Sequence, residues 1–415
     1  MTGIDVKILN AKLLNQREGL YQIAIKDGLI ADIAPSIPEE ALSEIDAQGQ
    51  LVTESYANPH LHLCKVYTLP MMDEIALEAY HGQDMGKAMN AIELAARVKE
   101  NYAVEWILPN VRKALALAAI YGNTHIRAFA DVDSKARLEG VKALLAAKQE
   151  FAGVVELQVV AFAQDGLVRE PGAEDLVIQA MELGADVVGG IPWIEFTDAD
   201  IQKHVEIIFD IAEKFNKPVS MLVDDAGDPG LRSLELMAVE AIHRGWQGRV
   251  LAHHARAQAM YPTPYLQKLA ALMKQAEMGL VTDPHTGPLH ARVRELLAED
   301  VLVCLGQDDI SDAYYPYGRN NMLEVAFLAS HLLWMTTNKE IETLYTMITT
   351  RAFQALGLPK MNLSIGAPAN LVALCQDNLV DALRYHQAPR VVISHGALVD
   401  KEKMLSLAGL DPEMG

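Results

Sequence analysis

Two histidines separated by a single residue, His60 and His62, follow a run of apolar residues and have the spacing of a metal-binding pair. Alternate side chains of a strand point to the same face, so both imidazoles are expected to face one centre. Imidazole nitrogens bind divalent metals such as zinc at about 2.1 Å. A pair of this kind is often a coincidence, so the rest of the chain must decide whether a metal site exists.

Other polar residues also stand where apolar runs end. A carboxylate in such a place can bind a metal and take a proton from water, and an imidazole or an amide can orient a ligand. Each has a simpler explanation, since carboxylates at these positions also cap helices and form turns. Neighbouring strand residues point to opposite faces, so only one histidine of the adjacent pair below is expected to face inward. The residues concerned are Gln164, Asp224, Asp225, His253, His254, Asp308 and Asp309.

The apolar runs and the segments between them predict the fold. Eight short apolar runs alternate with stretches whose apolar residues recur at three and four positions, which is the pattern of a (β/α)8 barrel. Functional residues of such barrels lie at the carboxyl ends of the strands, and the polar residues above are found there. We predict strands over residues 51–63, 124–132, 155–163, 185–191, 218–225, 249–254, 279–283 and 301–306.

The two ends of the chain are predicted to form a second, smaller β-structure. Residues 1–54 have the pattern of strands, with a hairpin at Asp27-Gly28, a dipeptide that favours a type I′ turn. The C-terminal part of the chain contains two further short apolar strands. We therefore predict a composite β-sandwich domain from residues 1–54 and 362–415, and a barrel domain from residues 55–361.

Composition excludes several classes of protein. The chain has 415 residues, with 55 acidic and 35 basic side chains and a formal net charge of −20, so no nucleic-acid partner is expected. It contains no run of about 18 apolar residues, so no membrane span is expected. No signal peptide is recognised at its start, and a cytoplasmic location is expected. Three widely separated cysteines, Cys64, Cys304 and Cys375, predict reduced thiols.

Six segments together resemble the amidohydrolase superfamily, and within it the branch of cytosine deaminase and N-isopropylammelide isopropylaminohydrolase. They extend over nearly the whole chain, and they are ANPHLHLCK, QVVAFAQDG, GADVVGGIPWIEFT, VLAHHARAQAMY, GQDDISDAYYPYGRNNMLE and GAPANLVAL. The resemblance implies a TIM barrel with a small β-sandwich domain, and an enzyme that hydrolyses C–N bonds of a small nitrogen heterocycle such as a pyrimidine or a triazine. Metal-activated water would attack a ring carbon, and ammonia or an amine would leave.

The same resemblance implies a metal site. His60, His62 and Asp308 would hold one divalent ion, either zinc or iron, with manganese as a further option. A further ligand would come from His254, or from Cys64 if strand alternation continues so that its thiol shares the inward face. By the same alternation, Lys65 is expected to point away from His62 and to have a minor role. Family members are often oligomers, so a homo-oligomer is expected.

Roles in catalysis and substrate binding also follow from the resemblance. Asp308 and Asp225 would move protons, and His254 would orient the attacking water. Gln164 and Asp309 would contact a small heterocyclic substrate.

The chain departs from the family pattern near the expected metal. A ligating histidine of strand five is replaced by Leu222, and Asp225 stands where the family has a catalytic glutamate. Phe129 and Gln307 occupy positions that are histidine in some members. Two interpretations remain open. In one, fewer ligands hold the metal; in the other, a degenerate barrel binds a related heterocycle without metal-dependent hydrolysis.

Overall fold

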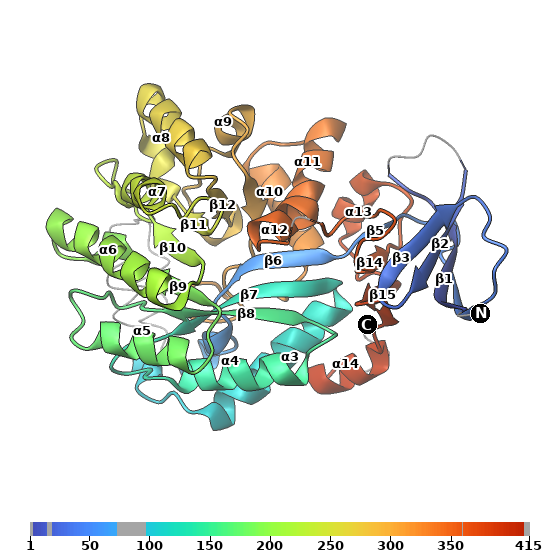
Figure 1. Cartoon of the computed structure of the whole chain (residues 1–415), viewed down its shortest axis with the longest axis horizontal. Coiled ribbons are helices and arrows are strands. Elements are labelled where there is room, and N and C mark those ends of the chain that lie inside the picture. Colours follow the sequence, from blue (N-terminus) through green and yellow to red (C-terminus); the bar gives the residue numbers. More distant parts are fainter. Residues whose placement is uncertain (1–2, 15–18, 73–96, 359, 411–415) are drawn as a thin grey trace.

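The computed structural model describes residues 3–14, 19–72, 97–358 and 360–410. Its largest element is a parallel sheet that curves into a barrel, with helices packed around the outside (Figure 1). The predicted (β/α)8 barrel is therefore confirmed. In spatial order its strands are β6 (Tyr56–Leu61), β7 (Asn123–Asp131), β8 (Glu156–Phe162), β9 (Val187–Gly190), β10 (Val219–Val223), β11 (Val250–His254), β12 (Gly279–Thr282) and β13 (Val303–Leu305).

The barrel closes where β6 meets the residues that follow β13. Leu61 forms a parallel bridge with Asp308. The amide of His62 donates to the carbonyl of Asp308 at 2.8 Å, and the amide of Asp308 donates to the carbonyl of His60 at 3.0 Å. The backbone hydrogen bonds that close the barrel therefore also place three predicted metal ligands, His60, His62 and Asp308, next to one another.

The first predicted strand, residues 51–63, is in fact two strands. Val52–Glu54 form β5, which pairs with a strand near the C-terminus in another sheet, whereas β6 belongs to the barrel. Ser55 lies between them, and its hydroxyl is hydrogen bonded to that of Thr124 at 2.7 Å. One apolar run thus serves two sheets, which periodicity alone does not reveal.

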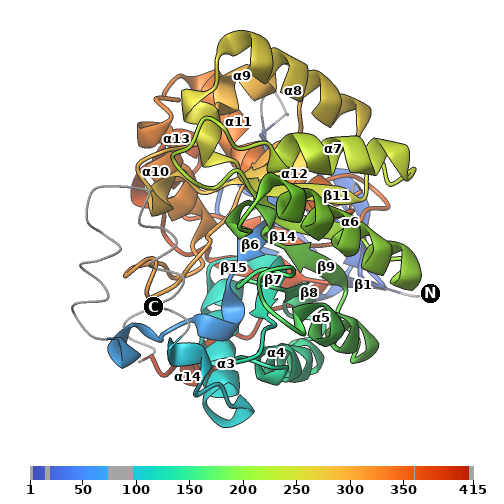
Figure 2. The same ribbon diagram turned by 90° about the vertical axis from the view of Figure 1, so that its left-hand side faces the viewer.

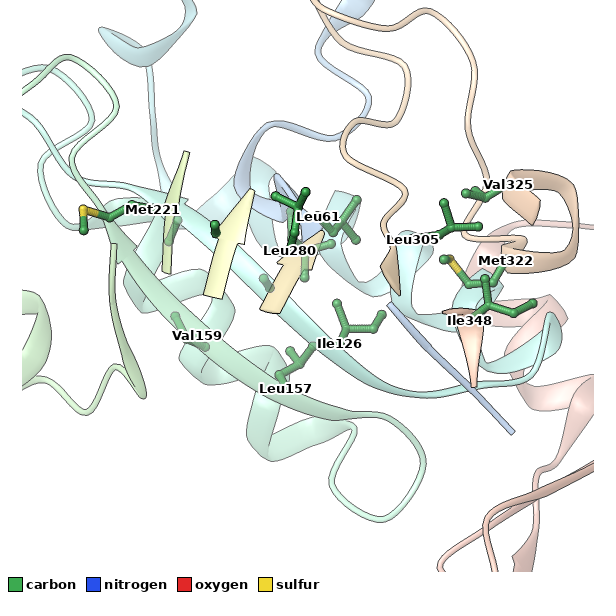
Figure 3. Close-up of a cluster of buried hydrophobic side chains, with 14 of the residues drawn as sticks. Leu61, Ile126, Leu157, Val159, Met221, Leu280, Leu305, Met322, Val325 and Ile348 are labelled. Carbon is green, nitrogen blue, oxygen red and sulfur yellow. The ribbon is translucent and has the colours of Figure 1, made fainter. Parts of the chain in front are cut away.

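Helices bury their apolar faces against the outside of the barrel. Figure 3 shows part of this core, in which Ile126 and Leu305 of the strands belong to one cluster with Met322 and Val325. The α-helices within the described residues are α3 (Val104–Ile120), α4 (Glu139–Glu150), α5 (Ala173–Glu182), α6 (Asp198–Phe215), α7 (Ser233–His243), α8 (Thr263–Gln275), α9 (Val293–Ala298), α10 (Met322–Leu332), α11 (Asn338–Ile348), α12 (Thr350–Ala355), α13 (Leu379–Tyr385) and α14 (Lys401–Ala408). Short 3₁₀ helices are η1 (Leu63–Lys65), η2 (Leu69–Met71), η4 (Pro192–Ile194), η5 (Arg256–Met260) and η6 (Pro284–Thr286).

Two further four-stranded sheets lie at one end of the barrel, on the right of Figure 1. Ile8 and Ile23 of one sheet share an apolar cluster with Leu371 and Ile393 of the other. Residues from both chain ends therefore pack together, while the exact domain limits stay a prediction. The sheets have the orders β3-β2-β1-β4 and β16-β15-β14-β5, with β1 (Ile4–Ala11), β2 (Tyr21–Lys26), β3 (Leu29–Ala34), β4 (Ala41–Asp46), β14 (Leu371–Ala373), β15 (Val391–Ser394) and β16 (Ala397–Leu398).

Local chemistry explains the hairpin between β2 and β3. Asp27 and Gly28 both have positive φ, 52° and 78°, as a type I′ turn requires. The predicted turn is therefore present. All three cysteines are free. Within the part of the chain that the structure describes, every helix is too short or too polar to cross a bilayer.

Candidate metal and catalytic site

Four buried side chains meet at the carboxyl end of the barrel strands. His60, His62, His254 and Asp308 each offer one ligand atom, and these atoms all lie within 4.8 Å of one another. Asp308 Oδ1 is 2.9 Å from His60 Nε2 and 3.7 Å from His62 Nε2. Three imidazoles and one carboxylate are a donor set that suits zinc and other divalent metals. We call these four residues the metal group.

The backbone explains why these side chains converge. His60 belongs to β6, and the Oδ1 atom of Asn58 accepts hydrogen bonds from the amides of both His60 and Gln307. Asp308 has a φ of 66°, a left-handed conformation that is uncommon for residues other than glycine. Its two backbone hydrogen bonds with His60 and His62, across the seam where β6 meets the residues after β13, hold it in that conformation. The carboxylate is thereby turned toward the two histidines.

The ionisation of three of these four residues favours metal binding. Burial opposes ionisation of Asp308, but His254 and the hydrogen bond with His60 outweigh it and hold its pKa well below the usual range. Burial lowers the pKa of His60, and burial together with Lys65 lowers that of His62 further. Metals bind ionised carboxylates and neutral imidazoles. Asp308, His60 and His62 therefore already have the forms that a metal requires.

His254 is held by a carboxylate on its other side. Its Nδ1 atom lies 2.9 Å from Asp283 Oδ2, which leaves Nε2 as the nitrogen available to the metal group. Such carboxylate–imidazole pairs commonly orient metal-binding histidines. Burial opposes protonation of His254, but Asp225 and Asp283 raise its pKa to about 9. A histidine with a raised pKa is a weaker ligand than His60 or His62, so the fit to a divalent ion rests on those two histidines and Asp308.

One wall of the site is apolar. Leu222 lies in a cluster with Phe129, and neither side chain can offer a ligand. The ring of Phe129 lies 4.6 Å from that of His60 and 5.4 Å from that of His62, measured between centroids. Any metal held here would therefore be bound from the side of β6, β11 and β13.

Asp225 lies outside the metal group. Its carboxylate forms a buried ion pair with the guanidinium of Arg256, the first residue of η5. Burial raises the pKa of Asp225 although Arg256 opposes the change. The adjacent Asp224 has a structural role, because it accepts hydrogen bonds from the hydroxyls of Ser233 and Tyr261.

Gln164 and Asp309 are connected through Lys65. The Lys65 ammonium donates to Gln164 Oε1 and lies 3.3 Å from Asp131 Oδ1. Gln164 Nε2 donates to the hydroxyl of Tyr314 at 3.2 Å. Asp309 is buried beside Asp308, and burial together with the charge of Asp308 raises its pKa well above the usual range. These groups add hydrogen-bonding atoms beside the metal group.

Two expectations from strand alternation are wrong, because β6 ends at Leu61 and η1 follows. Cys64 does not face the metal group. Its thiol lies 3.6 Å from the hydroxyl of Tyr102 and accepts from the amide of Asp131, and burial raises its pKa to about 12. Lys65, by contrast, turns into the site rather than away from it.

The expectation for the histidine pair of β11 is also wrong. The rings of His253 and His254 both face inward, with centroids 4.6 Å and 4.8 Å from that of His60. The φ angles of His254 and Ala255 are 67° and 50°, so the extended backbone ends there and alternation ends with it. Both ring nitrogens of His253 are buried without a hydrogen-bond partner among the described residues.

Sequence reasoning gave no role to three residues around this site, namely Arg256, Asp283 and Thr286. Asp283 directly follows β12, so its position at the end of an apolar run was an available signal. Arg256 and Thr286 lie in short 3₁₀ helices beyond the strand ends, where no periodic pattern marks them.

The chain is similar in sequence and structure to several known proteins. The amidohydrolase family model matches residues 43–400. N-isopropylammelide isopropyl amidohydrolase of Pseudomonas sp. (strain ADP) is 28% identical over 410 residues, which is 97% of this chain and 98% of that protein. The structure of 5-methylcytosine deaminase from Klebsiella pneumoniae liganded with 5-fluorocytosine has a TM-score of 0.85 and 30% identity, covering 95% and 97% of the two chains. The structure of N-isopropylammelide isopropylaminohydrolase from Burkholderia multivorans ATCC 17616 shares the fold, with a TM-score of 0.84, 24% identity, and coverage of 95% and 98%.

Proposed function

Because the chain belongs to the amidohydrolase family, we propose that it is a metal-dependent hydrolase that releases ammonia or an amine from a small nitrogen heterocycle. The observation that carries this proposal is the buried metal group at the carboxyl end of the barrel. The names of its relatives support the substrate class, since one is a 5-methylcytosine deaminase and another an N-isopropylammelide isopropyl amidohydrolase. A pyrimidine or a triazine is the proposed substrate.

In this proposal His60, His62 and Asp308 would hold the ion, and His254 lies beside them in the metal group. The chemistry that such an ion supplies when bound is the activation of water at neutral pH. Three protein ligands with an open position are the usual arrangement of catalytic zinc, so the absence of a ligand at Leu222 is compatible with catalysis. Zinc, iron and manganese all accept this donor set.

Proton transfer is assigned to carboxylates. Asp308 accepts the proton of the attacking water, and Asp225 delivers a proton to the leaving nitrogen, which must leave as a neutral amine or ammonia. Burial raises the pKa of Asp225, which suits a group that carries a proton. His254, held by Asp283, orients the water. Gln164 and Asp309 contact the ring.

The test combines metal content with product release. Protein loaded with zinc, iron or manganese is analysed for bound metal and then incubated with aminopyrimidines and alkylamino-triazines. We expect about one bound ion per chain and release of ammonia or amine from at least one compound. Substoichiometric metal together with no product from any compound would overturn the proposal.

A second function is favoured by a specific observation, the apolar wall of Leu222 and Phe129. Under this alternative the barrel binds a related heterocycle without hydrolysing it. Compounds from the same panel would then raise the melting temperature of chelator-treated protein, and no amine would appear. Product release that is lost on chelation would exclude this alternative.

A further inference from the structure

Arg256 is the centre of a second buried polar group beside the metal group. Its guanidinium pairs with Asp225, lies 3.4 Å from Asp283 Oδ1 and 3.6 Å from Asp308 Oδ2, and donates to Thr286 Oγ1 at 2.6 Å. These partners come from the loops after β10, β12 and β13, and Arg256 itself follows β11. One side chain, only 6% exposed, therefore joins four neighbouring loops at the mouth of the barrel.

Thr286 connects Arg256 to Asp308 of the metal group through two hydrogen bonds. Its hydroxyl accepts from Arg256 Nη2 and donates to Asp308 Oδ2 at 2.9 Å. A hydroxyl has a single proton to donate, and its oxygen also lies 3.0 Å from the carbonyl of Asp283. Because the guanidinium donates to the hydroxyl oxygen of Thr286, the hydroxyl hydrogen is free to be donated to Asp308 Oδ2. The other oxygen of that carboxylate, Oδ1, faces His60.

The orientation of Asp308 matters more in this chain than in a site with a full set of ligands. Leu222 supplies no ligand, and Asp308 is the sole carboxylate of the metal group. Groups that hydrogen bond to metal ligands typically change metal affinity by about 10–100-fold when they are removed. Arg256 also offsets the charges of Asp225 and Asp283, which face it from two other loops.

We propose that Arg256 is a positioning residue for the metal: through Thr286 it holds Asp308 in its ligating orientation, and so compensates for the ligand missing at Leu222. This inference rests on the proposed function, because it requires the metal group to bind an ion.

A positive charge so close to the metal group has an opposite effect if it acts by charge alone. Coulomb repulsion between the guanidinium and a divalent ion would weaken binding, so that removing Arg256 would strengthen it. Positioning predicts the reverse. The sign of the change in metal affinity therefore separates the two roles.

The experiment measures zinc affinity of the full-length protein by competition with a chromophoric chelator. The variants are Arg256→Met, Thr286→Val and Thr286→Ser, and the control is Arg292→Met, which removes a partly exposed arginine that pairs with Glu295. We expect Arg256→Met and Thr286→Val to weaken zinc binding about 10–100-fold. Thr286→Ser keeps the hydroxyl and should bind like the wild type, as should Arg292→Met. Cobalt-loaded Thr286→Val should also have an altered visible absorption spectrum, since the geometry around the ion changes.

The outcomes are distinguishable. Wild-type protein that binds none of zinc, iron and manganese would overturn the proposed function, and this inference with it. Wild-type protein that binds zinc, with Arg256→Met and Thr286→Val binding equally well or more tightly, would overturn this inference alone. Should Arg256→Met fail to fold, Thr286→Val decides, because it retains Arg256 and nearly preserves side-chain volume.

Discussion

At the scale of single residues, Asp308 connects most of the site. Its backbone closes the barrel, its Oδ1 atom faces His60 and His62, and its Oδ2 atom accepts from Thr286. Replacing a residue with these contacts changes the charge or the geometry of the metal group.

Asp308→Asn tests this connection. We expect the variant to fold but to lose the ionised ligand, so that bound metal falls and turnover drops at least about 10²–10⁴-fold. Elemental analysis and a steady-state assay on the substrate found by the screen measure the two effects. The control is Asp300→Asn, whose side chain is exposed. Full metal content and activity in Asp308→Asn would refute the assigned role.

Leu222→His restores the type of residue that the family pattern has on strand five. We expect the variant to bind zinc more tightly than the wild type, because a further imidazole becomes available to the ion. Placing a polar ring in the apolar cluster of Phe129 and Trp193 should cost about 1–3 kcal/mol of unfolding free energy in the metal-free protein. Chelator competition and urea denaturation measure these quantities. Leu222→Met is the control, and unchanged affinity in Leu222→His would show that position 222 cannot reach the ion.

At the scale of elements, the seam between β6 and the residues after β13 determines where the metal-group side chains lie. Gly306 directly follows β13 and lies against β6 and β12. A Cβ atom added to it would be 2.7 Å from His60 Cβ and 2.9 Å from Val281 Cγ1. The absence of a side chain there allows His60 to approach Asp308.

Gly306→Ala is therefore expected to displace His60. Zinc affinity should fall by about tenfold or more, because catalytic geometry tolerates displacements of only about 0.5 Å. Stability should fall by about 1–3 kcal/mol from overpacking. Chelator competition and thermal unfolding measure these changes. Wild-type zinc affinity in this variant would contradict the role given to the seam.

The same barrel has a pH-sensitive point at its opposite end, at the start of β7. His125 is buried beside His395, and burial lowers its pKa to about 3. The unfolded chain takes up a proton near pH 6.5 whereas the folded chain does not, so stability is lost as pH falls from about 6.5 toward 3. This residue alone should contribute up to about 5 kcal/mol to that loss.

His125→Gln isolates this contribution. We expect the unfolding free energy of the variant, followed by urea denaturation from pH 7 to pH 4, to decline less steeply than that of the wild type. His331→Gln is the control, because His331 is an exposed histidine on α10. Equal pH dependence in His125→Gln and wild type would contradict the burial argument.

At the scale of the whole molecule, the two small sheets share an apolar cluster that is distinct from the barrel core, which Val372 and Val392 of β14 and β15 join. Leu371 belongs to the core shared by the two sheets, whereas the metal group lies at the mouth of the barrel. Stability and metal binding should therefore respond differently to changes in the small sheets. The expected homo-oligomer stays a prediction.

Leu371→Ala tests this separation. We expect the unfolding free energy to fall by about 2–5 kcal/mol because a cavity replaces a buried side chain. Zinc affinity at a temperature where the protein is folded should equal that of the wild type. Leu42→Ala, which removes a side chain that is 87% exposed, should change neither quantity. A large loss of zinc affinity in Leu371→Ala would show that the small sheets support the site.

Much of this protein was determined by local sequence. Apolar runs of strand length and helical periodicity between them predicted the eight barrel strands, and the segments around His60, Gln164 and Asp308 predicted the family, which is confirmed. Such signals are local, because a strand's alternation and a residue's place at its end depend only on neighbouring residues.

Tertiary structure decided the rest of the site. Alternation predicted the wrong directions for Cys64 and Lys65, since a 3₁₀ helix replaces the strand after Leu61. Arg256 contacts partners up to 52 positions away in the sequence, the separation between residues 256 and 308. These contacts exist because barrel closure brings the loops after β10, β11, β12 and β13 together, and no periodicity within one segment encodes the distance between two loops.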